Sequence, residues 1–316
     1  MNLSTKQIYE KEHTQHMNRL VIVCGPTGVG KTAVAVTLAK KFNGELISAD
    51  SRQVYRGMDI GTGKDVASLQ GVPIWMYDIV NPDEQFNVRA YQKKANEYIE
   101  DIRKRNKLPI VVGGTGLYIQ SLVETVPSMG VVPDMKLRKT LNTYSIEKLQ
   151  ELVQKDYQEV WKKLNTSDRN NPQRLIRKIE LGRAGVPLVK PSLVIQDVCW
   201  IGLTALFPYL YSRIDNRVEK RIKHGVVDEV RQLKMKGYGW DLPSMSALGY
   251  REWKDYVEGN AIIEDVIQKW KYDEHGYARR QMTWFKRNKS IQWFDMSKAG
   301  YLENIERVFQ TWYTRK

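Results

Sequence analysis

One stretch, from Leu20 to Phe42, limits what this chain can fold into more than any other. It opens with the apolar run Leu20–Cys24, typical of a buried parallel strand, and ends with apolar residues spaced as on one face of a helix. Between them stands Gly25-Pro26-Thr27-Gly28-Val29-Gly30-Lys31-Thr32, which matches G-x-x-x-x-G-K-[ST]. Glycines let successive backbone N–H groups point into one concavity, and the helix N-terminus adds partial positive charge. The segment therefore predicts a cradle for a di- or triphosphate, with a ligand-free glycine-rich turn as the alternative.

Side chains in and just after this loop supply the chemistry. Lys31 brings a point charge, and Thr32 brings a hydroxyl of the kind that binds Mg²⁺ next to phosphates. A second strand is expected at residues 45–49, and it delivers Asp50 and Ser51 to the sheet edge beside the loop. The Asp50 carboxylate there would hold magnesium through water or accept a substrate proton, while a helix cap is the structural alternative.

Further apolar runs extend the core beyond this first unit. Strands are expected at residues 74–80, 109–112, 198–203 and 291–295. The run at 109–112 ends in Gly113-Gly114-Thr115-Gly116. A nucleotide hydrolase has a magnesium-binding aspartate at this place or nearby, and in this chain Asp78 is the candidate for that role. Ordinary nucleotide hydrolysis is therefore disfavoured.

The length allows two domains, and the pattern divides the chain into three parts. Residues 17–130 predict the first part of a core, residues 131–192 a helical insertion that resembles the lids of small kinases, and residues 193–316 the rest of the core with basic C-terminal helices. The polar residues 1–16 are expected to be a loose extension, with Met17 as an alternative start. The predicted class is thus an α/β fold, a P-loop NTPase-like parallel sheet flanked by helices, with a helical insertion domain.

Composition and charge narrow the partners. No run of about 18 apolar residues occurs, so no membrane-spanning helix is expected. Cys24 and Cys199 stand in apolar runs, which favours buried free thiols in a reducing cytoplasm. The chain carries 50 Lys and Arg against 36 Asp and Glu, a net charge of +14. This excess indicates a polyanionic partner, unless the protein is only generically basic.

Two groups of arginines show where part of this positive charge is concentrated. Arg213, Arg217 and Arg221 recur every four residues beside an apolar seam, which suits guanidinium groups that meet phosphate oxygens. In the insertion, Arg174 and Arg177 fall on one helical face, which is either solvated or binds an anion.

The helical stretch 261–289 becomes strongly basic in its second half. Its cations and interleaved aromatic rings there are Arg279, Arg280, Lys286, Arg287, Tyr277, Trp284 and Phe285. Because cations meet phosphates and rings stack on unpaired bases, the pattern favours a nucleic acid, with core packing as the alternative for the aromatics. Of three function classes, a small-molecule kinase leaves this helix unexplained, and a nucleic-acid-dependent NTPase needs a clear second magnesium aspartate. A transferase that holds a diphosphate leaving group fits both features.

Four blocks together resemble the bacterial tRNA dimethylallyltransferase family. They are the phosphate loop 25–32, Asp50–Thr62, Val112–Tyr118 and Arg279–Phe285. Their order and spacing fit over nearly the whole chain. Two departures are small: Gly28-Val29 stand where the family more often has Ala-Ser, and Asp65 stands where it has proline.

The resemblance implies transfer of a dimethylallyl group from dimethylallyl diphosphate to N6 of the adenosine 3′ to the anticodon, in tRNAs that read codons beginning with U. It implies Mg²⁺ as cofactor, with Thr32 as metal ligand. Its implied catalytic residues are Asp50, Thr27, Lys31 and Arg217. Its implied diphosphate-binding residues are Gly25, Pro26, Thr27, Gly28, Val29, Gly30, Lys31, Thr32, Arg213 and Arg217, with Arg217 favoured as the clamp. Its implied tRNA-binding residues are Asp50, Ser51, Arg52, Gln53, Thr115, Gly116, Arg138, Gln173, Arg174, Arg177, Arg279, Arg280, Gln281 and Trp284.

The implied reaction assigns a step to each group. Asp50 would accept the N6 proton while the amine attacks, Thr27 would orient the bridging oxygen, and the target base must leave its stack. An adenylate isopentenyltransferase acting on free AMP or ATP is the alternative, but the charge, the insertion and the basic helix favour tRNA. A monomer that binds the tRNA anticodon stem-loop, with no membrane partner, is expected.

Overall fold

The computed structural model describes residues 19–125, 127–185, 192–195 and 197–315, in two compact units. The first unit runs up to Val123 and resumes at Ile195, and the second is Glu124–Val194. The predicted insertion at 131–192 falls within the second unit, and its assignment as a functional domain stays a prediction. The expectations for residues 1–16 and for Met17 lie outside the described residues.

The first unit is built on a six-stranded, all-parallel sheet with the order β3-β2-β4-β1-β5-β6. Its strands are β1 (Leu20–Cys24), β2 (Gly44–Ala49), β3 (Ile74–Trp75), β4 (Leu108–Gly113), β5 (Val198–Thr204) and β6 (Gln292–Asp295). Gly113 pairs with Cys24 on one side and with Ala49 on the other. Three central strands therefore end level, so the phosphate loop, Asp50 and Gly114 leave the same edge of the sheet. The predicted α/β class is confirmed.

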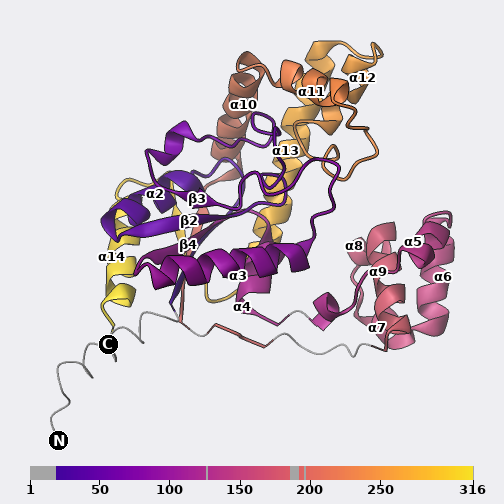
Figure 1. The fold of residues 1–316 in the computed structure, drawn as a ribbon, viewed down its shortest axis with the longest axis horizontal. Helices are drawn as coiled ribbons and strands as arrows, with labels where there is room; N and C mark the ends of the chain where they lie inside the picture. The colour runs from indigo at the N-terminus through magenta and orange to yellow at the C-terminus, as the bar shows by residue number, and fades with distance from the viewer. Residues whose placement is uncertain (1–18, 126, 186–191, 196, 316) are drawn as a thin grey trace, which may run out of the picture. The chain divides into compact units, whose positions relative to one another are not determined.

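Helices cover both faces of this sheet (Figure 1). The helices of the first unit are α2 (Lys31–Lys41), α3 (Val88–Lys104), α4 (Gly116–Val123), α10 (Phe207–Lys223), α11 (Val226–Met235), α12 (Lys254–Val257), α13 (Ile263–Phe285) and α14 (Tyr301–Tyr313), with the short helices η1 (Ala67–Leu69) and η3 (Arg251–Trp253). Of these, α11 and α12 lie away from the sheet (Figure 1).

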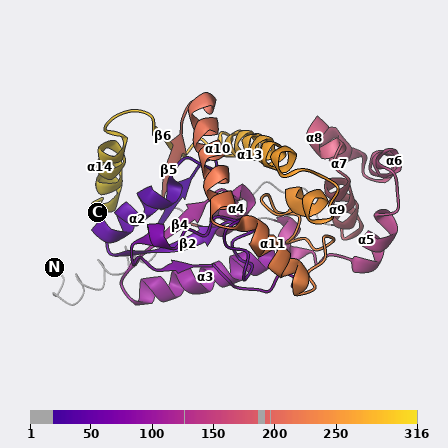
Figure 2. The same ribbon diagram turned by 90° about the horizontal axis from the view of Figure 1, so that it is seen from above.

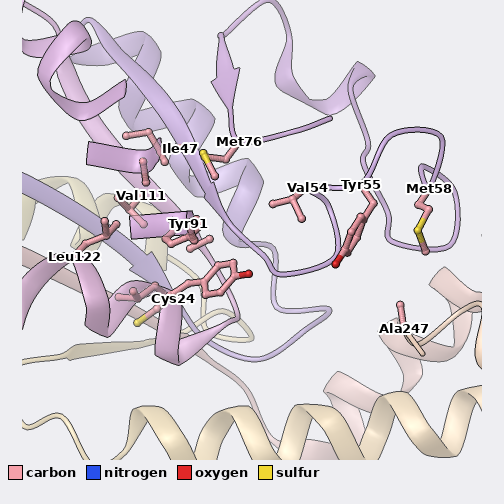
Figure 3. Packing of buried hydrophobic residues seen from close by; sticks show 14 of the residues in the cluster. Cys24, Ile47, Val54, Tyr55, Met58, Met76, Tyr91, Val111, Leu122 and Ala247 are labelled. Carbon is pink, nitrogen blue, oxygen red and sulfur yellow. The ribbon is translucent and has the colours of Figure 1, made fainter. Parts of the chain in front are cut away.

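Alternate strand residues face the two helical layers, as the two-residue period of a strand requires. Ile22 packs in one cluster with α3 and α4, and Val23 packs in the other with α2 and α14. Figure 3 shows the first cluster, where Ile47 and Val111 meet Tyr91 of α3. Since both faces are covered, the central strands read as continuous apolar runs.

The predicted strand at 74–80 is wrong beyond its first two residues. β3 ends at Trp75 because Met76 and Asp78 adopt positive φ angles of 72° and 56°, which break an extended chain. Lys64 holds this turn through an ion pair of 2.5 Å with Asp78, and a second pair of 2.7 Å joins it to Asp59.

The second unit is helical and has its own core. It contains η2 (Pro127–Gly130), α5 (Met135–Leu141), α6 (Ile146–Asp156), α7 (Gln158–Lys163), α8 (Thr166–Arg169) and α9 (Pro172–Arg183). Leu149, Val153 and Leu175 are fully buried in that core. Its two ends pair with each other, because Glu124 forms a bridge with Leu193 and the Thr125 amide donates to the Ser192 carbonyl at 2.7 Å.

Across the part of the chain that the structure describes, every helix is too short or too polar to cross a membrane.

Candidate functional site

The phosphate loop leaves β1 and ends at the first turn of α2. Gly28 and Gly30 have φ angles of 79° and 85°, in the left-handed region that glycine tolerates best. A Cβ atom on Gly25 would lie 2.4 Å from the Leu203 carbonyl oxygen, so only glycine fits there. Among the described residues, no side chain caps the N-terminus of α2. Its first backbone N–H groups thus stay available for an anion.

Lys31 is the cation of this loop. Its Nζ donates to the Pro26 carbonyl at 2.8 Å, which holds the ammonium over the loop. Burial, reinforced by the neighbouring charge of Arg217 and opposed by Asp50, lowers the Lys31 pKa from 10.5 to about 8. Because burial is the main cause, an anion bound beside Lys31 would favour its charged form.

The arginine row on α10 divides into different roles. Arg217 donates from Nη2 to the Thr27 hydroxyl, and its buried Nε has no hydrogen-bond partner in the described structure. Arg213 donates from Nε to the Gly28 carbonyl at 3.0 Å. Arg221 is buried, and its Nη1 lies 3.1 Å from Glu274. Two of the three arginines therefore touch the phosphate loop, and the third is buried but also lines the cavity.

Asp50 lies at the end of β2, and one of its oxygens, Oδ1, accepts from the Arg52 backbone N–H at 2.8 Å. Asp50 lines one cavity of about 360 Å³ together with Thr27, Lys31, Thr32 and other residues. A phosphate cradle and a carboxylate thus face the same space.

The residues after Asp50 and those after β4 are tied together. The Ser51 amide donates to the Thr115 hydroxyl at 3.1 Å. Arg52 and Gln53 also line the cavity, but their polar groups are engaged. Arg52 donates to the Pro243 carbonyl at 2.5 Å, and Gln53 accepts from Ser48 at 2.9 Å. In this structure both side chains order the loops around the cavity.

Helix α13 explains why β4 ends in glycines. The Gln281 side chain accepts from the Thr27 amide at 2.7 Å and donates to the Gly114 carbonyl at 3.0 Å. A Cβ on Gly114 would lie 2.0 Å from Gln281 Nε2, and one on Gly116 would lie 2.1 Å from the Trp284 ring. Gln281, predicted to contact tRNA, thus holds the two loops together, and it also lines the cavity. Trp284 is 37% exposed.

The remaining predicted cations of α13 stay at the surface. Arg279 and Arg280 are exposed, and Arg280 lines the cavity. Arg279 donates to the Tyr211 hydroxyl at 2.6 Å, and the Arg280 guanidinium lies 5.9 Å from the Tyr277 ring centroid. These two side chains are therefore accessible to a ligand.

In the second unit, the predicted tRNA-binding residues form two groups. Arg138 and Arg177 both pair with the buried Glu180, at 2.7 Å and 2.8 Å, and so order the unit's interior. Arg174 is exposed and pairs with Asp168, and the exposed Gln173 donates to Asn142 at 3.3 Å.

Sequence reasoning missed two carboxylates that hold the site's surroundings, Glu274, which is buried, and Glu229, which is half-buried. Glu274 of α13 pairs with both Arg217 and Arg221. Glu229 of α11 accepts from the backbone amides of residues 59–61 at 2.8–3.0 Å. The spacing of seven residues between Glu274 and Gln281 puts both on one face of α13, a signal that could have found the first.

The oxygen donors of the cavity fit a magnesium ion that is also bound by the phosphates of a substrate. The described residues contain no group of three or more His, Cys, Asp and Glu that could hold a metal. Thr32 and Asp50 nevertheless line the cavity beside the loop. Mg²⁺ takes one or two protein oxygens and completes its shell with phosphates and water.

The chain matches known proteins over nearly its whole length. Residues 53–288 match the family described as IPP transferase, and residues 18–85 match isopentenyl transferase. The tRNA dimethylallyltransferase of Roseiflexus sp. is 40% identical over 301 residues, 93% of this chain and 98% of that protein. That of Bacillus cereus is 37% identical over 302 residues, 92% and 94% of the two chains.

Solved structures show the same fold. The tRNA delta(2)-isopentenylpyrophosphate transferase of Staphylococcus epidermidis has a TM-score of 0.69 at 33% identity, over 94% of this chain and 99% of that one. A eukaryotic dimethylallyltransferase acting on tRNA has a TM-score of 0.77 at 24% identity, over 92% and 78%.

Proposed function

The chain belongs to the tRNA dimethylallyltransferase (IPP transferase) family, and from this premise we propose that it transfers a dimethylallyl group from dimethylallyl diphosphate to tRNA. The acceptor is N6 of the adenosine 3′ to the anticodon, in tRNAs that read codons beginning with U. One observation carries the mechanism: the Asp50 carboxylate lines the same cavity as Thr27, Lys31 and Arg217.

The cationic side of the cavity stabilises the leaving group. As the bond from carbon to oxygen breaks, negative charge grows on the diphosphate. The loop amides, the Lys31 ammonium and the unpartnered Nε of Arg217 are donors for that charge. Arg217 also donates to the Thr27 hydroxyl, which orients that hydroxyl toward the bridging oxygen in this proposal. Mg²⁺ held at Thr32 would supply further charge neutralisation when bound.

Asp50 is the base. Adenine N6 is a weak nucleophile whose proton is not acidic, so the proton must leave while the amine attacks the allylic carbon. The Arg52 amide holds Oδ1 of Asp50, which fixes the carboxylate at the strand end. The carboxylate is thereby held in the cavity that the phosphate loop also lines.

The tRNA is bound as a polyanion with one exposed base. A base stacked in a loop must be extruded to reach an enclosed cavity, and exposed aromatic rings favour this step by stacking. Trp284, Arg279 and Arg280 are accessible for such contacts on the first unit. On the second unit, Arg174 and Gln173 are exposed. We propose the anticodon stem-loop as the bound region and a monomer as the active form.

Nucleoside mass spectrometry tests the reaction directly. Incubation with dimethylallyl diphosphate and unmodified tRNA should yield N6-dimethylallyladenosine, and AMP in place of tRNA should yield none. Transfer of label from γ-labelled ATP to any acceptor would instead support a kinase. Preference for AMP, with binding independent of salt, would overturn the choice of tRNA.

The role of Asp50 has its own test. Asp50→Ala should keep the affinity for tRNA and for diphosphate but lose most turnover. Asp83→Ala, which changes an exposed aspartate, is the matched control. Turnover near that of the wild type would exclude Asp50 as the base.

A further inference from the structure

Helices α10 and α13 lie side by side (Figure 2). One buried carboxylate joins them at the site. Glu274 of α13 is 4% exposed. Its Oε1 lies 3.1 Å from Arg221 Nη1, and its Oε2 lies 3.3 Å from Arg217 Nη2. One acid thus faces two guanidinium groups on consecutive turns of α10.

The same face of α13 also holds the phosphate loop. Gln281, two turns after Glu274, accepts from the Thr27 backbone amide. Arg217, held by Glu274, donates to the Thr27 hydroxyl. The backbone amide of Thr27 is therefore held directly by α13, and its hydroxyl is held through Arg217.

The surrounding charges show what a partner for Arg217 must offset. Lys31, Arg217 and Arg221 all line the cavity, and burial together with the nearby charge of Arg217 lowers the pKa of both Lys31 and Arg221. Arg217 keeps 33% of its side chain exposed, so solvent is open to it. Without a nearby carboxylate, repulsion would drive the guanidinium outward and away from Thr27.

We propose that Glu274 is a positioning residue for the transfer reaction: it holds Arg217 against Thr27, so that the guanidinium is in place when the diphosphate binds. Glu274 also lines the cavity, but in this proposal it acts through Arg217. This inference rests on the proposed role of Arg217 as a diphosphate clamp.

The first test compares two acids that join the same pair of helices. Glu274→Gln removes the charge beside Arg217. Glu219→Gln is the control, because Glu219 pairs with Lys271 of α13 at 2.5 Å but with neither arginine. We expect Glu274→Gln to weaken binding of inorganic pyrophosphate and to lower kcat by about 10- to 100-fold, the usual effect of losing a charge-assisted hydrogen bond. The KM of Glu274→Gln for tRNA should equal that of the wild type. The control variant Glu219→Gln should keep the pyrophosphate affinity and the kcat of the wild type.

The second test separates positioning from simple neutralisation of a buried charge. Glu274→Gln could unfold the protein because it leaves Arg221 unpaired, so the double variant Glu274→Gln with Arg221→Gln removes both charges. The double variant should regain thermal stability but not pyrophosphate affinity or turnover. The proposal would be overturned if the double variant regained pyrophosphate affinity and turnover, or if Glu274→Gln alone bound pyrophosphate as tightly as the wild type.

Calorimetry with pyrophosphate keeps this inference distinct from the proposed function. If the wild type bound pyrophosphate but modified no tRNA, the proposed function would fail while the role of Glu274 could still be measured. If the wild type modified tRNA and Glu274→Gln bound pyrophosphate normally, the positioning role alone would fail.

Discussion

Replacing Lys31 by methionine should stabilise the protein while it destroys the phosphate site. A lysine whose pKa falls from 10.5 to about 8 carries its charge at a cost of about 3 kcal/mol at neutral pH. Methionine has a similar length and no charge, but it loses the hydrogen bond to the Pro26 carbonyl, worth about 1 kcal/mol. The net gain is about 2 kcal/mol, or an increase of about 4 °C in Tm.

The pH dependence gives this prediction its sign. The folded pKa of Lys31 lies below the unfolded one, so between about pH 8 and 10.5 the unfolded chain binds more protons. The wild type therefore gains stability relative to Lys31→Met as pH rises through this window. The advantage of the variant should be full below about pH 8 and should vanish before pH 10.5. At about pH 10.5 the charge cost is gone and only the lost hydrogen bond, about 1 kcal/mol, remains, so the wild type is then the more stable.

Urea unfolding followed by tryptophan fluorescence, at about pH 7 and about pH 10, measures the difference. Lys40→Met, on the exposed side of α2, is the control and should change stability by less than about 0.5 kcal/mol. Saturating pyrophosphate should raise the Tm of the wild type but not of Lys31→Met. A variant less stable than the wild type at neutral pH, or a difference independent of pH, would refute the reasoning.

Three further changes test contacts outside the reacting groups. Gly116→Ala should push the Trp284 ring away and weaken tRNA binding at least severalfold in a filter assay, with pyrophosphate binding retained; unchanged tRNA affinity would show that the ring has no role. Glu229→Gln should loosen the loop at 59–61 and cost about 2 kcal/mol, seen as faster limited proteolysis there, and equal cleavage rates would contradict this. Glu180→Gln leaves two arginines without their carboxylate and should destabilise the second unit by about 3 kcal/mol, measured by hydrogen exchange in α9; unaltered exchange would mean that these ion pairs add nothing.

The sheet and the cradle could be predicted from sequence because their signals are local. The run Leu20–Cys24 is apolar throughout because helices cover both faces of the strand, and the loop that follows has a fixed spacing. The strand at 74–80 failed for the opposite reason. Its turn depends on an ion pair between Lys64 and Asp78, and nothing in the local pattern announces such a tertiary contact.

The roles of polar side chains were harder to predict than the positions of strands. Arg138 and Gln281 are polar residues of helices, and from sequence alone they look as suited to tRNA as their exposed neighbours. The structure gives Arg138 a carboxylate 42 residues away and gives Gln281 an amide 254 residues away. Whether a cation is free for a ligand depends on such distant partners, which periodicity does not encode.

The pairing of the two ends of the second unit has a consequence for how the chain assembles. β4 and β5 are both neighbours of β1, although residues 124–194 separate them in sequence. Since the bridge between Glu124 and Leu193 closes this segment on itself, the entropy lost in joining β5 to the sheet is that of a short connection. We therefore expect that the segment can be shortened or exchanged at this bridge with little effect on the topology of the sheet.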